Sequence, residues 1–293
     1  MFRTLVRSFA TERLLALVGV LGLVLGAACA LVMWARDSAF ISPEGDLTKA
    51  ITFDLAVGIY VLTLALYAPL ASFSPRGRRR WRNWTIGLTL YAYAVETTQV
   101  LRGLDPRFSR LGTLADVALG ILLFVTALGL IVTFIVLAVK LFRGPAHDRD
   151  PLLLLSMRYG SATTMLAFAA GLWMSGVQGR LTGESGNILP LHALGFHGLQ
   201  AVPLIALMLA RSPLAYDSAR RWIHVAGAAW LGATLAVAAQ TAIGRSVTEI
   251  STFPVLGELL LAIWLVVASG SLLLWRRGRV SEGLANRANS ITL

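Results

Sequence analysis

The sequence predicts an all-α protein, a polytopic bundle of about eight membrane-spanning helices with both termini in the cytoplasm. Three observations lead to this fold class. Hydrophobic residues make up 56% of the chain and charged residues only 14%, with a mean hydropathy of +0.71, whereas soluble domains carry about 25% charged residues. Long apolar stretches recur along the whole chain, and the loops between them are alternately rich and poor in arginine.

The apolar stretches define the expected helices. A helix needs roughly 20 apolar residues to cross the hydrocarbon core. The stretches are too long for barrel strands and lack their alternation. They use most of the chain and leave no room for a soluble domain. The eight expected spans are residues 13–34, 50–73, 84–102, 111–141, 159–178, 190–210, 222–243 and 254–275.

The distribution of basic residues predicts the orientation. With a cytoplasmic N-terminus, 19 of the 26 Lys and Arg residues fall on the cytoplasmic side and seven on the other. Short cytoplasmic loops carry such an excess, which predicts that both termini are cytoplasmic. The net charge of +11 could suggest nucleic acid, but basic residues placed in this way face anionic lipid headgroups. We therefore expect the lipid bilayer, and not nucleic acid, as a partner.

Residues 1–293 are expected to form one transmembrane domain with two possible halves, 1–143 and 152–293. The long connection between them contains Pro145 and Pro151. The third and seventh helices end alike, with Gln99 before an Arg102-Gly103 exit and Gln240 before a Gly244-Arg245 exit. A duplication of four helices would preserve the orientation of each half.

Polar residues inside the spans are the candidates for function, because a charge there costs ~2.5–3.5 kcal/mol on insertion scales. Counting rises from the outer ends places Glu96 ~9 Å and His197 ~10 Å deep, with Asp54 and Asp116 at ~6–8 Å. All lie in the outer half of the membrane. They could line a polar cavity open to the outside. Alternatively, Asp54 and Asp116 are interfacial acids that favour the positive ends of helix dipoles.

The leading hypothesis is a cavity that binds or transports a small solute or a lipid headgroup. Glu96 and His197 would form a proton-sensitive pair if their helices face each other, and Arg102 would attract an anionic headgroup or solute. The predicted ligand-binding residues are Glu96, Gln99, Arg102, His197, Gln200, Asp116 and Asp54.

Two alternatives remain open at this point. One is a membrane enzyme or redox protein with a metal or haem at His197, although His192 and His197 share a helix and cannot clamp one iron. The acids and histidines also lack the close spacing of metal-ligand motifs, so we expect no metal and no cofactor. The other alternative is a structural subunit of a membrane complex.

Two segments carry resemblances. Residues 195–204, Gly-Phe-His-Gly-Leu-Gln-Ala-Val-Pro-Leu, together with the two helix exits, resemble a family of uncharacterised bacterial multi-pass membrane proteins. This resemblance implies an inner-membrane bundle.

The second resemblance is local. Glu96-x-x-Gln99, followed by Asp105, Asp116 and Gly120, is similar to the pattern of VanZ-like membrane proteins, a family associated with glycopeptide resistance. The asparagine that the family pattern has between the last aspartate and the glycine is missing here. The resemblance implies that Glu96, Gln99, Arg102 and Asp116 act near the outer headgroups.

Overall fold

The computed structural model describes residues 9–143 and 150–291, with the side chains described up to residue 278. The chain divides into two compact units, residues 2–144 and 145–293, and each is described by itself. We call them the first and the second unit. The predicted division of the sequence into halves 1–143 and 152–293, and the single domain, stay predictions.

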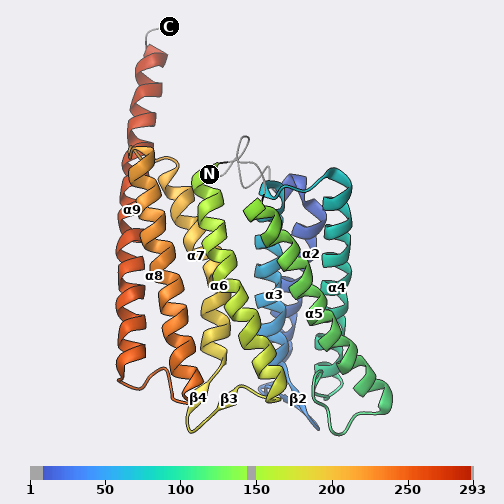
Figure 1. The fold of residues 1–293 in the computed structure, drawn as a ribbon. Helices are drawn as coiled ribbons and strands as arrows, with labels where there is room; N and C mark the ends of the chain where they lie inside the picture. Colours follow the sequence, from blue (N-terminus) through green and yellow to red (C-terminus); the bar gives the residue numbers. More distant parts are fainter. Residues whose placement is uncertain (1–8, 144–149, 292–293) are drawn as a thin grey trace. The chain divides into compact units, whose positions relative to one another are not determined.

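The first unit is a set of antiparallel helices with a short hairpin at one end (Figure 1). Helix α2 packs on α3, and α4 packs on α2, α3 and α5. Ser74 caps α4 by accepting a hydrogen bond from the Gly77 amide, and Pro75 occupies its first turn, where a missing N–H costs nothing. The elements are α2 (Arg13–Arg36), β1 (Phe40–Ile41), β2 (Gly45–Asp46), α3 (Leu47–Tyr67), η1 (Ala68–Leu70), α4 (Pro75–Leu101) and α5 (Leu114–Arg143).

The second unit has the same order of α-helices and strands, without a counterpart of η1 among its described residues. Helix α6 packs on α7 and α8, and α9 packs on α7 and α8. Asp150 caps α6 by accepting hydrogen bonds from the Leu152 and Leu153 amides, and Pro151 is again in the first turn. The elements are α6 (Pro151–Gly176), β3 (Leu181–Thr182), β4 (Gly186–Asn187), α7 (Leu189–Leu209), α8 (Tyr216–Ala242) and α9 (Thr252–Ile291).

Seven helices of the described residues are long and apolar enough to cross a membrane. They are the helices of a polytopic, all-α membrane protein, as predicted. The helix missing from the seven is α4, which corresponds to the predicted span 84–102. It has the length, but it begins with five arginines between Arg76 and Arg82 and buries several polar residues further on. An eighth span and cytoplasmic termini therefore stay predictions.

In both units the hairpin is fixed to the end of a helix by a glycine. Gly103 follows α4 with φ +78° and accepts a hydrogen bond from the Glu44 amide at 2.7 Å. A β-carbon at Gly103 would collide with the Ser42 carbonyl oxygen, and L-residues avoid this φ. Gly244 follows α8 with φ +76° and accepts from the Ser185 amide at 3.0 Å.

The local structure repeats between positions 141 residues apart. Asp37 and Gln178 both have a left-handed backbone, with φ +50° and +51°. The pairing of Phe40 with Asp46 in the first hairpin recurs as Leu181 with Asn187 in the second. Buried apolar clusters recur with the same spacing, because Cys29, Leu47 and Ala50 correspond to Ala170, Ile188 and Leu191. Positions 141 residues apart therefore correspond, and a residue of one unit can serve as a control for its counterpart in the other.

Candidate functional site

Charged and polar side chains gather where the hairpin of the first unit meets the α4–α5 loop. We call residues 40–54 and 96–116 the hairpin end. It holds six carboxylates, Glu44, Asp46, Asp54, Glu96, Asp105 and Asp116, and four cations, Lys49, Arg102, Arg107 and Arg110. The formal charge of the hairpin end is therefore −2 when every group is ionised.

Glu96 lies on the buried side of α4 and is fully buried. Its Oε1 accepts a hydrogen bond from Nη2 of Arg107 at 2.8 Å. The Arg107 side chain comes from the loop after α4, is 37% exposed and lies with its guanidinium 5.2 Å from the centre of the Phe53 ring. The other carboxylate oxygen, Oε2, has no hydrogen-bond partner among the described residues. Glu96 therefore keeps an unused acceptor in the interior of the first unit.

Asp54 lies on α3 and is also fully buried. Its Oδ2 accepts a hydrogen bond from the Thr97 hydroxyl at 2.8 Å, and its Oδ1 has no hydrogen-bond partner in the described part of the chain. None of the ion pairs in the described residues includes Asp54. A buried polar group without a partner costs about 1–3 kcal/mol, so Asp54 and Glu96 are both costly to the fold.

Asp116 has a structural task as well as an ionic one. Thr113 and Asp116 form a reciprocal cap at the start of α5: the Thr113 amide donates to Oδ2 of Asp116 at 2.8 Å, and the Asp116 amide donates to the Thr113 hydroxyl. This geometry is that of a capping box. Oδ1 of Asp116 accepts from Arg102 at 2.6 Å and from Gln99 at 3.1 Å. The sequence-based alternative, an acid at a helix N-terminus, thus describes part of what Asp116 does.

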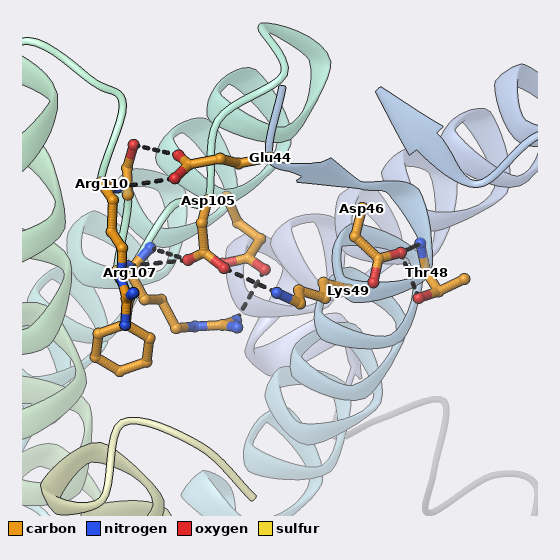
Figure 2. Close-up of polar contacts among 10 residues, drawn as sticks. Glu44, Asp46, Thr48, Lys49, Asp105, Arg107 and Arg110 are labelled. Atoms are coloured by element: carbon orange, nitrogen blue, oxygen red, sulfur yellow. Dashed lines mark hydrogen bonds and ion pairs between the residues drawn. The ribbon is translucent and has the colours of Figure 1, made fainter. Parts of the chain in front are cut away.

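Two further carboxylates, Asp105 and Glu44, connect neighbouring segments at the surface of the hairpin end (Figure 2). Lys49 on α3 donates to Asp105 at 2.8 Å, and the Arg107 and Phe108 amides donate to the other oxygen of Asp105. Burial raises the pKa of Asp105, but the Lys49 ammonium and these amides outweigh burial, so its pKa lies below the usual value.

Glu44 joins the hairpin to the loop. It accepts hydrogen bonds from the Ser109 hydroxyl at 2.6 Å and from the Arg110 amide at 2.9 Å, and Figure 2 shows it reaching across to Arg110. The Ser109 hydroxyl and then the Arg110 amide lower the pKa of Glu44. The hairpin end is therefore held by contacts that need ionised carboxylates.

Five of the seven predicted binding residues lie in the first unit, and two lie in the second. Glu96 and Asp54 are buried at the hairpin end, while Gln99, Arg102 and Asp116 form one hydrogen-bonded group beside them. His197 and Gln200 lie on α7 of the second unit. The pair of Glu96 with His197 stays a prediction.

Sequence reasoning missed the loop residues that contact the carboxylates. Arg107, Asp105, Glu44 and Lys49 were not among the expected binding residues. A signal was present, because the arginine-poor side still places Arg102, Arg107 and Arg110 within one short loop. Positive charge there opposes the positive-inside bias, which favours a local role for these arginines.

The matched positions of the second unit are apolar or neutral. Glu96 corresponds to Val237, Asp54 to Gly195 and Arg107 to Thr248. The glutamine is shared. Gln240 donates to the Ser246 carbonyl at 2.9 Å and accepts from Ser251 at 3.1 Å, whereas Gln99 donates to Asp116 of α5, so each joins the end of its helix to residues that follow it. The glutamine therefore belongs to the common architecture, whereas the buried carboxylates belong to the first unit.

No group of three or more His, Cys, Asp or Glu side chains within residues 9–143 and 150–278 is arranged to hold a metal ion. No family model, curated protein or solved structure matches the chain.

Proposed function

We propose that the protein is an integral inner-membrane protein that binds an ammonium group at the hairpin end, on a small solute or on a lipid headgroup. The observation that carries this proposal is the pair of buried carboxylates, each with one oxygen that lacks a hydrogen-bond partner. An ammonium has three donors and no acceptor, so a bound ammonium would supply the donors that these oxygens lack. Its single positive charge also offsets half of the formal charge of −2.

The second unit supports a functional reading of these carboxylates. It repeats the hairpin and its glycine contact with Val237 and Gly195 in place of Glu96 and Asp54. The architecture thus forms without the two acids. Ionisable residues inside membrane-spanning helices are expensive and mark functional sites, and the two buried carboxylates occur in the first unit, with neutral residues at the corresponding positions of the second.

The exposed arginines suggest how a larger ligand would lie. Half of the Arg102 side chain and more than a third of Arg107 are exposed at the hairpin end. An anionic group attached to the ammonium can approach them from the surface, because guanidinium binds phosphate and carboxylate groups well. This arrangement favours a zwitterion, such as an amine next to a phosphate.

Calorimetry on the purified protein in nanodiscs tests the proposal with ethanolamine, phosphoethanolamine and inorganic phosphate as probes. Ethanolamine and phosphoethanolamine should bind, and phosphate alone should not. D54N and E96Q should each weaken binding about tenfold, as the loss of one charged contact does. The control is E258Q, which removes an exposed acid on α9 of the second unit. Binding of phosphate alone, or equal affinities in all variants, would refute the proposal.

A further inference from the structure

A line of polar side chains follows the buried side of α4 from one end of the helix to the other. Arg82, Thr85, Thr89, Tyr93 and Glu96 are three or four residues apart, the spacing that places side chains on one helix face. The last four have relative exposures of 0–1%. The span from Arg82 to Glu96 is ~21 Å at the rise of an α-helix, which is most of the thickness of a hydrocarbon core. We call these five residues the α4 stripe.

Several atoms of the stripe have no hydrogen-bond partner in the described part of the first unit. They are the Thr89 hydroxyl, the Tyr93 hydroxyl, Oε2 of Glu96 and Nε of Arg82. Only the Thr85 hydroxyl is bonded within the helix, to the Trp81 carbonyl at 3.0 Å. Threonine in an apolar helix usually bonds its own backbone in this way. The unused hydroxyls of Thr89 and Tyr93 are therefore not explained by helix packing.

Each end of the stripe carries a buried carboxylate paired with arginine. At the hairpin end Glu96 pairs with Arg107. At the other end of α4, Glu12 is fully buried and pairs with Arg78 at 3.3 Å and Arg82 at 3.4 Å. We call this end the basic end. Two carboxylates thus lie at opposite ends of a line of hydroxyl groups.

Neighbouring helices leave room for this line. The Tyr93 hydroxyl occupies the space beside Gly22 of α2, where any β-carbon would collide with it, and the Asp54 backbone oxygen lies at the same place. The tyrosine therefore reaches from α4 to α2 and α3 near the Asp54 side of the site. It continues the polar line from Glu96 into the middle of the unit.

The second unit repeats the order of helices and hairpin without the stripe. The matched residues are Ile223, Ala226, Trp230, Thr234 and Val237 for the stripe, and Leu153 for Glu12. The Trp230 indole donates to the Leu194 carbonyl, and the Thr234 hydroxyl donates to the Trp230 carbonyl. The polar groups at these positions are thus satisfied. The architecture does not require the polar residues that α4 carries.

We propose that the hydroxyl groups of the α4 stripe, Thr85, Thr89 and Tyr93, form a proton relay through the first unit between Glu96 at the hairpin end and Glu12 at the basic end. Arg82 stays protonated and passes no proton; it holds Glu12 at that end. This goes beyond ligand binding at the hairpin end, although it shares Glu96. A hydroxyl accepts a proton on its oxygen and releases its own proton to the next group, so one proton crosses and no heavy-atom bond changes. Side chains one turn apart are ~5–6 Å apart at Cβ, so one water between successive hydroxyls completes the chain.

Sealed liposomes containing the purified full chain and a trapped pH dye test the relay. A potassium gradient with valinomycin imposes the membrane potential that drives protons inward. The wild type should acidify the lumen faster than protein-free liposomes. T89V and Y93F, which each remove one hydroxyl, should slow acidification by about tenfold or more, since positioned proton-transfer groups contribute at least that much. E96Q should abolish the flux.

Two controls separate the relay from misfolding and from ligand binding. T234V removes the hydroxyl matched to Tyr93 in the second unit and should keep the wild-type flux. T89V should keep the wild-type helix content, melting temperature and ethanolamine affinity, because valine has nearly the shape of threonine and Thr89 lies away from the hairpin end. Wild-type flux equal to that of empty liposomes, or wild-type flux in both T89V and Y93F, would overturn the relay. A wild type that conducts protons but does not bind ethanolamine would refute the binding proposal and leave the relay standing.

Discussion

Replacing Arg107 with methionine tests the energetics of the buried Glu96 carboxylate. The variant R107M keeps the apolar stem over Phe53 but removes the cation that contacts Glu96 at 2.8 Å. Removing one partner of a buried ion pair costs about 3–5 kcal/mol. Because Arg107 is 37% exposed, solvent screens part of the interaction, and we expect a loss of about 2–3 kcal/mol of unfolding free energy.

Removing the carboxylate instead of the cation should cost much less unfolding free energy. E96Q leaves Arg107 with an exposed guanidinium that water can solvate, so we expect a loss below about 1 kcal/mol. The double variant E96Q/R107M holds no buried charge at this place and should be more stable than R107M alone. The sign of the stability difference between the double variant and R107M is the clearest test, because it is the same for any dielectric constant assumed for the interior.

Unfolding in mixed micelles with increasing sodium dodecyl sulfate, followed by far-ultraviolet circular dichroism, measures these differences. The expected order of stability is wild type, E96Q, the double variant and then R107M. A result in which E96Q is the least stable variant would refute the reasoning. So would a double variant less stable than R107M, because Glu96 would then not be a carboxylate that needs its cation.

Three further predictions concern the hairpin end. G103A should lose about 2–3 kcal/mol of unfolding free energy, from its left-handed backbone and the collision with Ser42; unchanged stability in the same micelle titration would contradict the geometry. T113A should lose about 1 kcal/mol of unfolding free energy, as other N-cap replacements do, because it removes the Thr113 hydroxyl that bonds Asp116. An unchanged crosslinking yield between engineered cysteines flanking the loop would count against this. The pKa of Glu44 is lowered, so its contact with Arg110 is favoured above the unfolded pKa of about 4.3 and is lost as the pH falls through the folded pKa. Amide hydrogen exchange at Arg110, corrected for the intrinsic effect of pH, should accelerate only below the folded pKa of Glu44.

The helices could be predicted from the sequence, but where several of them begin could not. Hydropathy finds the part of a helix that lies in hydrocarbon, so the third and fifth helices were expected from residues 84 and 159. They begin at Pro75 and Pro151, where Ser74 and Asp150 cap them. These capping signals stand in the sequence, but polar residues next to them hid the helical turns. The two-residue strands were not predicted, since a strand so short has no periodicity to detect.

That three of the acids lie close to one end of the first unit could be predicted from the sequence, but their contacts could not. Counting rises identified Glu96, Asp54 and Asp116 as one layer, and these three lie in the first unit near its hairpin end. Glu96 bonds Arg107, eleven residues further along the chain, and this contact was not predicted, while the pair with His197 stays a prediction. A loop can fold back on its own helix, and no helical periodicity describes such a return. The contacts of Glu44 with residues 109 and 110 were out of reach for the same reason.

The carboxyl groups of Asp54 and Glu96 test the central claim most directly, through their own carbon resonances. Solid-state nuclear magnetic resonance on protein labelled with carbon-13 at aspartate and glutamate carboxyls, assigned with D54N and E96Q, follows both groups as ethanolamine is added. The account predicts that both resonances shift together and saturate at one ligand concentration, while the resonance of Glu258 stays in place. Resonances of Asp54 and Glu96 that do not move at any ethanolamine concentration would contradict it.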